Sequence, residues 1–425
     1  MKHHSAPTIT IIPAKPALVA GRESTTYFLI RIEPPAPEPR AERRRLNLGI
    51  VLDRSGSMAG DKLVRAKEAV AFALRNMAPD DLVSLTIYDD RVRMLVPALP
   101  VSEAAARILA LLPGIDAGRT TALYDAWVQG SIAVSRRLDP ERLNRVLLIS
   151  DGLANVGVID PETIVTRVRE LFSSGVSTST IGIGSDFNED LMIPMAVSGG
   201  GVGWFVESPA DLKRIFEAEL AGLAALYSDK GALRIEPRRP GTKVVEILND
   251  LPSGPEGWRI GDLNHGQPLE IVARVAAHGG EPGQPLDLFD VRLWLELPGQ
   301  GRIELQQLAR VTGGEAERVA AMPVHPDVDR AVELLSAARA RRETVEFIDR
   351  GDYESARDLT AQWSLRMSRL HARLGDEEAR LDAGQFRDLG SLLRATQHPG
   401  PARSLARKRA SYQRYFRAWR SGRSG

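Results

Sequence analysis

Residues 46–226 alternate between short apolar runs and stretches in which apolar residues recur every three or four positions. The first run, at 46–52, reads LNLGIVL and suits a strand buried on both faces. The next stretch, 61–77, carries its apolar residues on one face of a helix. Strand-like runs at 81–88 and 91–99 are joined by a turn-like Asp-Asp pair. The pattern predicts an α/β fold with a doubly wound, mostly parallel sheet and one antiparallel hairpin at its edge.

Strand-like segments flank this α/β pattern, and the C-terminal part of the chain is helical. Two strand-like runs precede residue 34 and several more follow residue 228, so we expect one β-sandwich into which the α/β domain is inserted. Apolar residues at three- and four-residue steps between Ala356 and Leu374 predict a small helical bundle. The expected parts are 1–40 as the first sandwich strands, 41–227 as the α/β domain, 228–325 as the sandwich, and 326–425 as a helical region with a basic tail.

Composition narrows the classes of function. The 425 residues carry a net charge of +1, so the chain as a whole has no bias toward nucleic acid or anionic membranes. Cysteine is absent, which rules out disulfides, thiolate nucleophiles and thiolate metal sites. No apolar run is long enough to cross a bilayer, and Pro13, Lys15 and Pro16 interrupt the N-terminal apolar stretch. We therefore expect a cytoplasmic protein.

Hydroxyl and carboxylate side chains cluster near the predicted carboxyl ends of the strands, where doubly wound sheets bind their ligands. The clusters are Asp53, Ser55 and Ser57 in DRSGS, Thr120 and Thr121 in GRTTALYDAW, and Asp151 in LLISDGLAN. Oxygen ligands without histidine or cysteine suit Mg²⁺ or Mn²⁺. Taken alone, the DRSGS segment is equally compatible with a cap on the following helix, because Ser and Asp are favoured at that position.

Together these clusters resemble the metal-ion-dependent adhesion site of the von Willebrand factor type A family. The family's D-x-S-x-S motif corresponds to Asp53, Ser55 and Ser57, and its strand-end aspartate corresponds to Asp151. The resemblance covers about residues 46–226, and the motifs follow one another in the family's order. The flanking regions are similar to those of bacterial proteins that contain such a domain.

The family's loop threonine has two candidates in this chain. Thr121 matches better, because TALYDA resembles the family's sequence and places the small residue Ala126 five positions further on. Thr120 is the alternative ligand. With either threonine the resemblance implies an intact adhesion site in which no element of the motif is missing.

The resemblance implies a non-enzymatic interaction or adaptor module that binds an acidic residue of a partner protein through Mg²⁺ or Mn²⁺. It also implies that Gly56 lets the ligand loop turn tightly. One alternative is a metal-dependent hydrolase or phosphotransfer protein, although none of the seven histidines lies in the α/β domain to act as a general base. Another alternative is a structural assembly protein whose metal site is idle.

The C-terminal tail, 401–425, has eight basic residues and no acidic ones. We expect a last helix that packs one apolar face on the bundle and leaves its basic side in solvent. That face would contain Leu405, Tyr412, Phe416 and Trp419. The alternative is contact of residues 403–423 with an acidic partner or anionic lipid, and the sequence predicts no specific nucleic acid.

Overall fold

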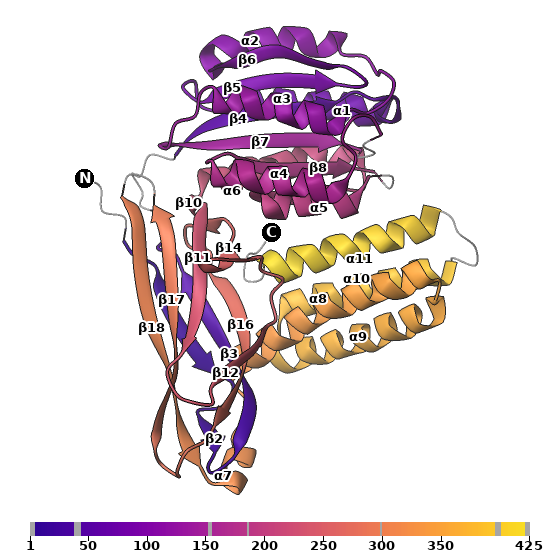
Figure 1. Ribbon diagram of the computed structural model, residues 1–425. Helices are drawn as coiled ribbons and strands as arrows, with labels where there is room; N and C mark the ends of the chain where they lie inside the picture. The colour runs from indigo at the N-terminus through magenta and orange to yellow at the C-terminus, as the bar shows by residue number, and fades with distance from the viewer. Residues whose placement is uncertain are drawn as a thin grey trace. The chain divides into compact units, whose positions relative to one another are not determined.

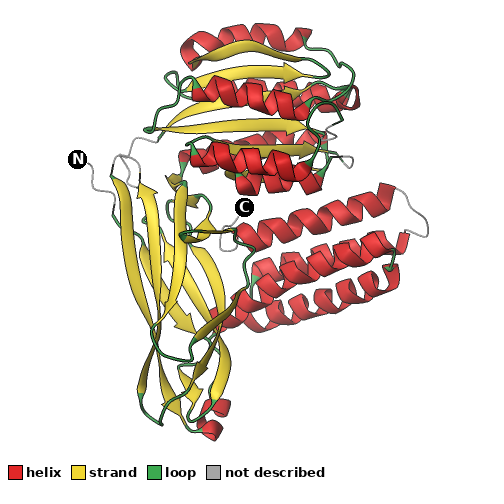
Figure 2. Ribbon diagram, in the orientation of Figure 1, coloured by secondary structure: helices red, strands yellow, loops and turns green. Residues whose placement is uncertain are grey.

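The chain forms two compact units in the computed structural model, one of Met1–Pro37 with Lys230–Gly425 and one of Glu38–Asp229. Figure 1 labels their helices and strands, and Figure 2 colours them by type. Each unit is described by itself. The structure describes residues 5–37, 44–151, 155–184, 187–297, 300–395 and 401–420.

The second of these units, residues 38–229, is built on one six-stranded sheet. In spatial order its strands are β6 (Val92–Pro100), β5 (Leu82–Tyr88), β4 (Arg45–Asp53), β7 (Arg142–Ser150), β8 (Ser177–Ile183) and β9 (Gly200–Val206). All neighbours pair in parallel except β5 and β6, which form an antiparallel hairpin at the edge. The predicted doubly wound, mostly parallel sheet is therefore confirmed, including its hairpin edge.

Helices cover this sheet (Figure 2). They are α1 (Asp61–Asn76), α2 (Val101–Leu111), α3 (Leu123–Ser135), α4 (Pro161–Ser173), α5 (Glu189–Ser198) and α6 (Leu212–Ala224), and a short strand β10 (Leu226–Ser228) follows. Strand β4 is buried at every position after Arg45, which explains why its sequence is an uninterrupted apolar run.

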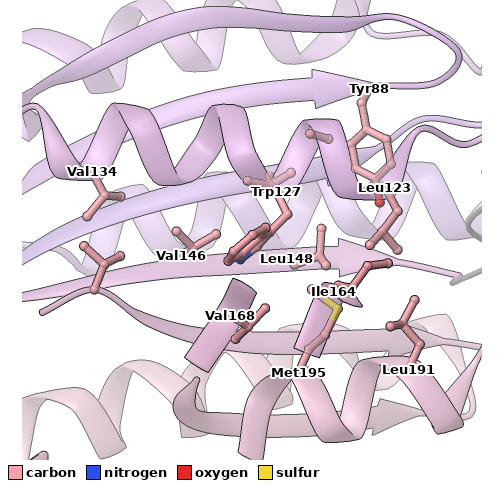
Figure 3. Packing of buried hydrophobic residues seen from close by; sticks show 13 residues of the cluster. Tyr88, Leu123, Trp127, Val134, Val146, Leu148, Ile164, Val168, Leu191 and Met195 are labelled. Carbon is pink, nitrogen blue, oxygen red and sulfur yellow. The ribbon is translucent and has the colours of Figure 1, made fainter. Parts of the chain in front are cut away.

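Helix α3 packs into the centre of the unit's core (Figure 3). Its Leu123 and Trp127 join Val146 and Leu148 of β7 and residues of α4 and α5 in one buried cluster. The backbone of α3 lies close to the Val51 side chain of β4 at a glycine, because a Cβ on Gly130 would lie 2.3 Å from Val51 Cγ2. This close approach fixes β4, and with it the loop that follows β4.

Two sheets make up the strand part of the first unit. The four-stranded sheet contains β1 (Thr8–Pro13), β3 (Glu23–Glu33), β16 (Leu269–His278) and β12 (Lys243–Ile247). The six-stranded sheet contains β13 (Ser253–Gly254), β14 (Gly257–Ile260), β11 (Lys230–Pro237), β17 (Pro285–Leu297), β18 (Gly301–Gly314) and β2 (Ala17–Val19), and β15 (Leu263–Asn264) also belongs to this unit.

Strands from before and after the α/β segment share these sheets. Strand β3 pairs antiparallel with β16, and β2 pairs in parallel with β18. Buried Phe28 of β3 and Phe289 of β17 meet edge to face with ring centroids 5.0 Å apart, so side chains of the two sheets contact each other. The further interpretation, a β-sandwich that carries an inserted α/β domain, stays a prediction.

The predicted helical C-terminal region is present. It consists of α7 (Ala316–Ala321), α8 (Pro326–Arg350), α9 (Tyr353–Leu374), α10 (Glu377–Ala395) and α11 (Pro401–Arg420). The predicted apolar stripe of α9 lies in the core of this helical region, where Met367 and Leu370 are buried with Leu334 of α8 and Phe386 of α10. Among the described residues no helix is both long enough and apolar enough to span a membrane.

Helix α11 packs through a different face from the predicted one. Its Ala406 and Ala410 are fully buried with Ile348 of α8, whereas Leu405 and Tyr412 are only half-buried. Small residues stand at this contact because they let the two helices approach closely. Phe416 is half-buried too, and the Trp419 side chain lies outside the described residues.

The glycine contact between α3 and β4 predicts a measurable cost. Gly130→Ala should lower the free energy of unfolding by about 1–2 kcal/mol, because overpacking against the stiff Val51 outweighs the gain of about 1 kcal/mol in helix propensity. Urea unfolding of the purified chain measures the change. Gly384→Ala in α10 is the matched control, since a Cβ at position 384 would meet no atom within 4 Å and the same propensity gain should stabilise it. Equal stabilisation of both variants would contradict the packing argument.

Candidate functional site

The loop after β4 holds two of the predicted ligands in buried positions. Asp53, the last residue of β4, is 0% exposed, and Ser55 is 1% exposed. Asp53 Oδ1 accepts a hydrogen bond from the Ser55 backbone N–H at 2.7 Å. Asp53 Oδ2 accepts one from the hydroxyl of Ser150, the last residue of the neighbouring strand β7, at 2.5 Å. The carboxylate is therefore oriented from both strands.

Ser57 and Asp151 extend this arrangement. The hydroxyl oxygens of Ser55 and Ser57 lie 3.2 Å apart, and the Ser57 hydroxyl donates to Asp151 Oδ1 at 2.7 Å. Asp151 is 2% exposed and follows directly after β7. Four of the five predicted ligands thus form one continuous series of contacts, through the Ser55 backbone N–H and then through hydroxyl and carboxylate oxygens, that joins the ends of β4 and β7.

The threonine loop reaches the same edge of the sheet through its backbone. The N–H of Gly56 donates to the carbonyl of Arg119 at 2.8 Å, and the N–H of Gly118 donates to the carbonyl of Arg54 at 2.6 Å. Two residues further on, Thr121 is buried, whereas Thr120 is exposed. The different burial favours Thr121 as the inward-facing residue, and the choice of ligand stays a prediction.

Asn155 holds Thr121 in place, a role that the sequence patterns do not reveal. Its side-chain Oδ1 accepts from the Thr121 N–H at 2.8 Å, and its own N–H donates to the Thr121 carbonyl at 3.2 Å. This reciprocal pair links the threonine loop to the chain that follows Asp151. The only signal was a polar residue soon after a strand-end aspartate, and many loops contain one.

The DRSGS segment does not cap the following helix. The N-cap of α1 is Gly60, and Ser55 precedes the short 3-10 helix η1 (Gly56–Met58) without a capping bond from its side chain. The expected role of Gly56 in a tight turn is also wrong as stated. The left-handed residue of the loop is Gly60, with φ of 78°, whereas a Cβ on Gly56 would meet Arg119 O at an ordinary 3.4 Å.

Two buried carboxylates give the site a negative electrostatic character. Burial raises the pKa of Asp53 to about 6, and the charge of Asp151 adds to this, although hydrogen bonds from Ser150 and Ser55 oppose it. Burial and then the charge of Asp53 raise the pKa of Tyr88 well above its usual value. Lys62 of α1 supplies a positive charge, because its Nζ lies 2.8 Å from Asp151 Oδ2.

A second ion pair holds the loop but is not part of the series of contacts from Asp53 to Asp151. Arg54 Nη2 lies 2.5 Å from Asp89 Oδ2, and Arg54 Nη1 donates to the carbonyl of Asp116 at 3.0 Å. Although burial opposes it, the backbone N–H of Arg91 and the charge of Arg54 lower the pKa of Asp89. A Cβ on Gly118 would lie only 2.0 Å from Asp89 Oδ2, so this contact requires a glycine. The predicted Asp89-Asp90 turn is present between β5 and β6.

The donor set fits a hard divalent cation. It offers two carboxylates and up to three hydroxyls, which are ligand types that Mg²⁺ and Mn²⁺ accept while they retain bound water. Among the described residues, no three or more His, Cys, Asp or Glu side chains are grouped so that they could hold a metal ion.

Part of the chain matches a known domain family. Residues 48–153 match the family model described as von Willebrand factor type A domain. This segment of the chain is therefore similar to a von Willebrand factor type A domain. Domains of this family commonly mediate protein–protein interaction. The match begins in β4 and ends just after Asp151, so it contains all the predicted ligands.

Similar proteins come from distant organisms. The chain is 28% identical over 183 residues to the uncharacterized protein YfbK of Escherichia coli, a match that covers 41% of this chain and 30% of that protein. It is 28% identical over 172 residues to human inter-alpha-trypsin inhibitor heavy chain H4, covering 39% of this chain and 18% of that protein. The chain thus spans less than a third of either relative.

A solved structure extends the likeness in fold beyond the α/β unit. A von Willebrand factor type A protein from Catenulispora acidiphila matches with a TM-score of 0.71 and covers 99% of this chain and 98% of its own. The sequence identity is 16%, so this match shows similarity of fold alone.

The buried charge of Asp53 predicts a dependence of stability on pH. The pKa of this carboxyl is about 6 in the folded protein against 3.8 when exposed, so ionisation opposes folding. Its contribution is fully present below pH 3.8 and is lost as the pH rises through about 6, a loss of about 3 kcal/mol at pH 8. Asp53→Asn should therefore stabilise the EDTA-treated protein by about 1–3 kcal/mol at pH 8 and by much less at pH 4.

Urea unfolding in EDTA at the two pH values measures this difference. Asp89→Asn is the matched control, since the pKa of Asp89 is lowered and the substitution should destabilise the protein at pH 8. Destabilisation by Asp53→Asn at pH 8 would show that the hydrogen bonds of Asp53 outweigh the cost of its buried charge.

Proposed function

We propose that the type A domain binds Mg²⁺ or Mn²⁺ and that the protein is a non-enzymatic adaptor that captures an acidic residue of a partner protein. The proposed ligands are Asp53, Ser55, Ser57, Thr121 and Asp151. The observation that supports this most strongly is the continuous series of contacts from Asp53 to Asp151, in which none of the side chains caps a helix. A bound divalent cation would supply positive charge for a partner's carboxylate.

Side-chain chemistry favours binding over catalysis. The α/β unit contains no histidine and no cysteine, and the carboxylates nearest the proposed metal are themselves ligands. A hydrolase would need a separate general base to activate water or a hydroxyl nucleophile. The non-enzymatic role and the cytoplasmic location remain predictions, as does an assembly role in which the metal site is idle.

The basic tail contributes less to this proposal. Arg407 pairs with Asp349 of α8 at 2.7 Å, and Arg414 pairs with Asp250 at 2.7 Å. Arg403 donates to the carbonyl of Ile348 and stacks over the Tyr353 ring. These contacts within the unit favour a packing role for the described part of residues 403–423, and an acidic partner for the tail is the weaker alternative.

Metal binding is tested by calorimetric titration of Mg²⁺ and Mn²⁺ into EDTA-stripped protein. We expect one saturable site, and we expect Ser55→Ala and Asp151→Asn each to weaken it about tenfold or more, because each removes a proposed ligand. Ser102→Ala is the matched control, since Ser102 is exposed in the first turn of α2. Absence of saturable binding to the wild-type protein would refute the proposal.

The adaptor role makes a separate prediction about turnover. Purified protein with Mg²⁺ should show no phosphatase or ATPase activity above that of the Asp151→Ala variant, because no general base accompanies the proposed ligands. Substrate hydrolysis followed by released phosphate measures this directly. Turnover that depends on Mg²⁺ and disappears in Asp151→Ala would instead support the hydrolase alternative.

A further inference from the structure

Lys62 reaches the proposed metal site from the first turn of α1. Its Nζ lies 2.8 Å from Asp151 Oδ2, and its side chain is 21% exposed whereas that of Asp151 is 2% exposed. The lysine side chain passes over Gly184, the residue after β8, where a Cβ would lie 3.1 Å from Lys62 Cε. The ammonium group therefore lies at the solvent side of a buried carboxylate.

Both oxygens of the Asp151 carboxylate have a partner in this arrangement. Oδ1 accepts from the Ser57 hydroxyl at 2.7 Å, and Oδ2 pairs with Lys62 at 2.8 Å. Charge-assisted hydrogen bonds of this kind are roughly twice as strong as neutral ones. Lys62 thus neutralises a negative charge that would otherwise attract a metal cation.

Formal charges show why this lysine matters to the function. Asp53 and Asp151 together carry two negative charges, so a divalent cation bound between them leaves a formally neutral site. A neutral site offers little long-range attraction to an incoming carboxylate. The ammonium of Lys62 makes the loaded site positive by one charge, which favours a negatively charged ligand.

We propose that Lys62 is a specificity-determining residue that weakens cation binding at the site and strengthens binding of a carboxylate by the loaded site. The inference rests on the proposed function, since it presumes a cation held by Asp53 and Asp151. It adds that one side chain shifts two equilibria in opposite directions. Neither a metal ligand nor a purely structural residue would have that effect.

The test compares Lys62→Met with Lys62→Arg and Lys67→Met. Methionine removes the charge and keeps a long flexible side chain, whereas arginine restores the charge. Lys67 is the matched control, because it lies on α1 as well but donates to the carbonyl of Ile115 at 3.0 Å, away from the carboxylates. Circular dichroism and thermal unfolding first establish that each variant is folded.

Three measurements follow on these proteins. In EDTA, Lys62→Met should unfold about 2–4 °C lower than wild type, because Asp151 loses its counter-charge. Calorimetric titration should show Mg²⁺ binding to it about tenfold more tightly, since the ammonium no longer repels the cation. Acetate added to the Mn²⁺-loaded proteins, followed through the relaxation rate of water protons, should bind Lys62→Met several-fold more weakly.

Lys62→Arg and Lys67→Met should stay within about twofold of wild type in both titrations. If the wild-type protein binds Mg²⁺ and Lys62→Met binds it equally or more weakly, the role of Lys62 is refuted and the metal site stands. Acetate binding that is unchanged in Lys62→Met would likewise overturn the role in carboxylate capture. If wild-type protein binds neither Mg²⁺ nor Mn²⁺, the proposed function and the inference fail together.

Discussion

The parallel pairing of β4 with β7 is the constraint on which the candidate site depends. The register runs from Arg45 opposite Arg142 to Leu52 opposite Ile149, so the two strands end at the same level of the sheet. Asp53 and Asp151 stand at these two ends, and both side chains are buried. Backbone geometry therefore forces together two negative charges that would separate in water, and the sheet offsets their repulsion through its packing.

The surrounding loops are held by contacts that do not use the oxygen ligands. Arg54 and Asp89 pair with each other, Gly118 leaves room for Asp89, and Asn155 binds both backbone groups of Thr121. These contacts order the loops at the edge of the sheet before any ligand arrives. Such preorganisation lowers the entropy that binding must overcome, and it separates the residues that shape the site from those that would touch a ligand.

Sequence patterns predicted the sheet, which is confirmed, and a ligand set, which stays a prediction, because both depend on local signals. The apolar run of β4 and the D-x-S-x-S spacing are each readable over a few residues. Lys62, Asn155 and the Arg54–Asp89 pair were missed, because their roles arise from contacts between segments far apart in the chain. The prediction of the packing face of α11 failed for a similar reason. The small residues Ala406 and Ala410 are buried there because α8 and α11 lie close together. Hydropathy alone predicts that Leu405 is more buried than Ala406, because it contains no information on how closely two helices pack.

A second buried ionic group in the same sheet shows what distinguishes the candidate site. Arg145 of β7 pairs with Glu219 of α6, and Glu219 also accepts hydrogen bonds from Ser179 and Trp204. Both charges are buried, opposite in sign and satisfied, as a structural pair requires. At the carboxyl ends of the strands the balance differs, because two carboxylates meet one lysine. The excess of negative charge at the carboxyl ends of the strands is what the proposed cation would offset.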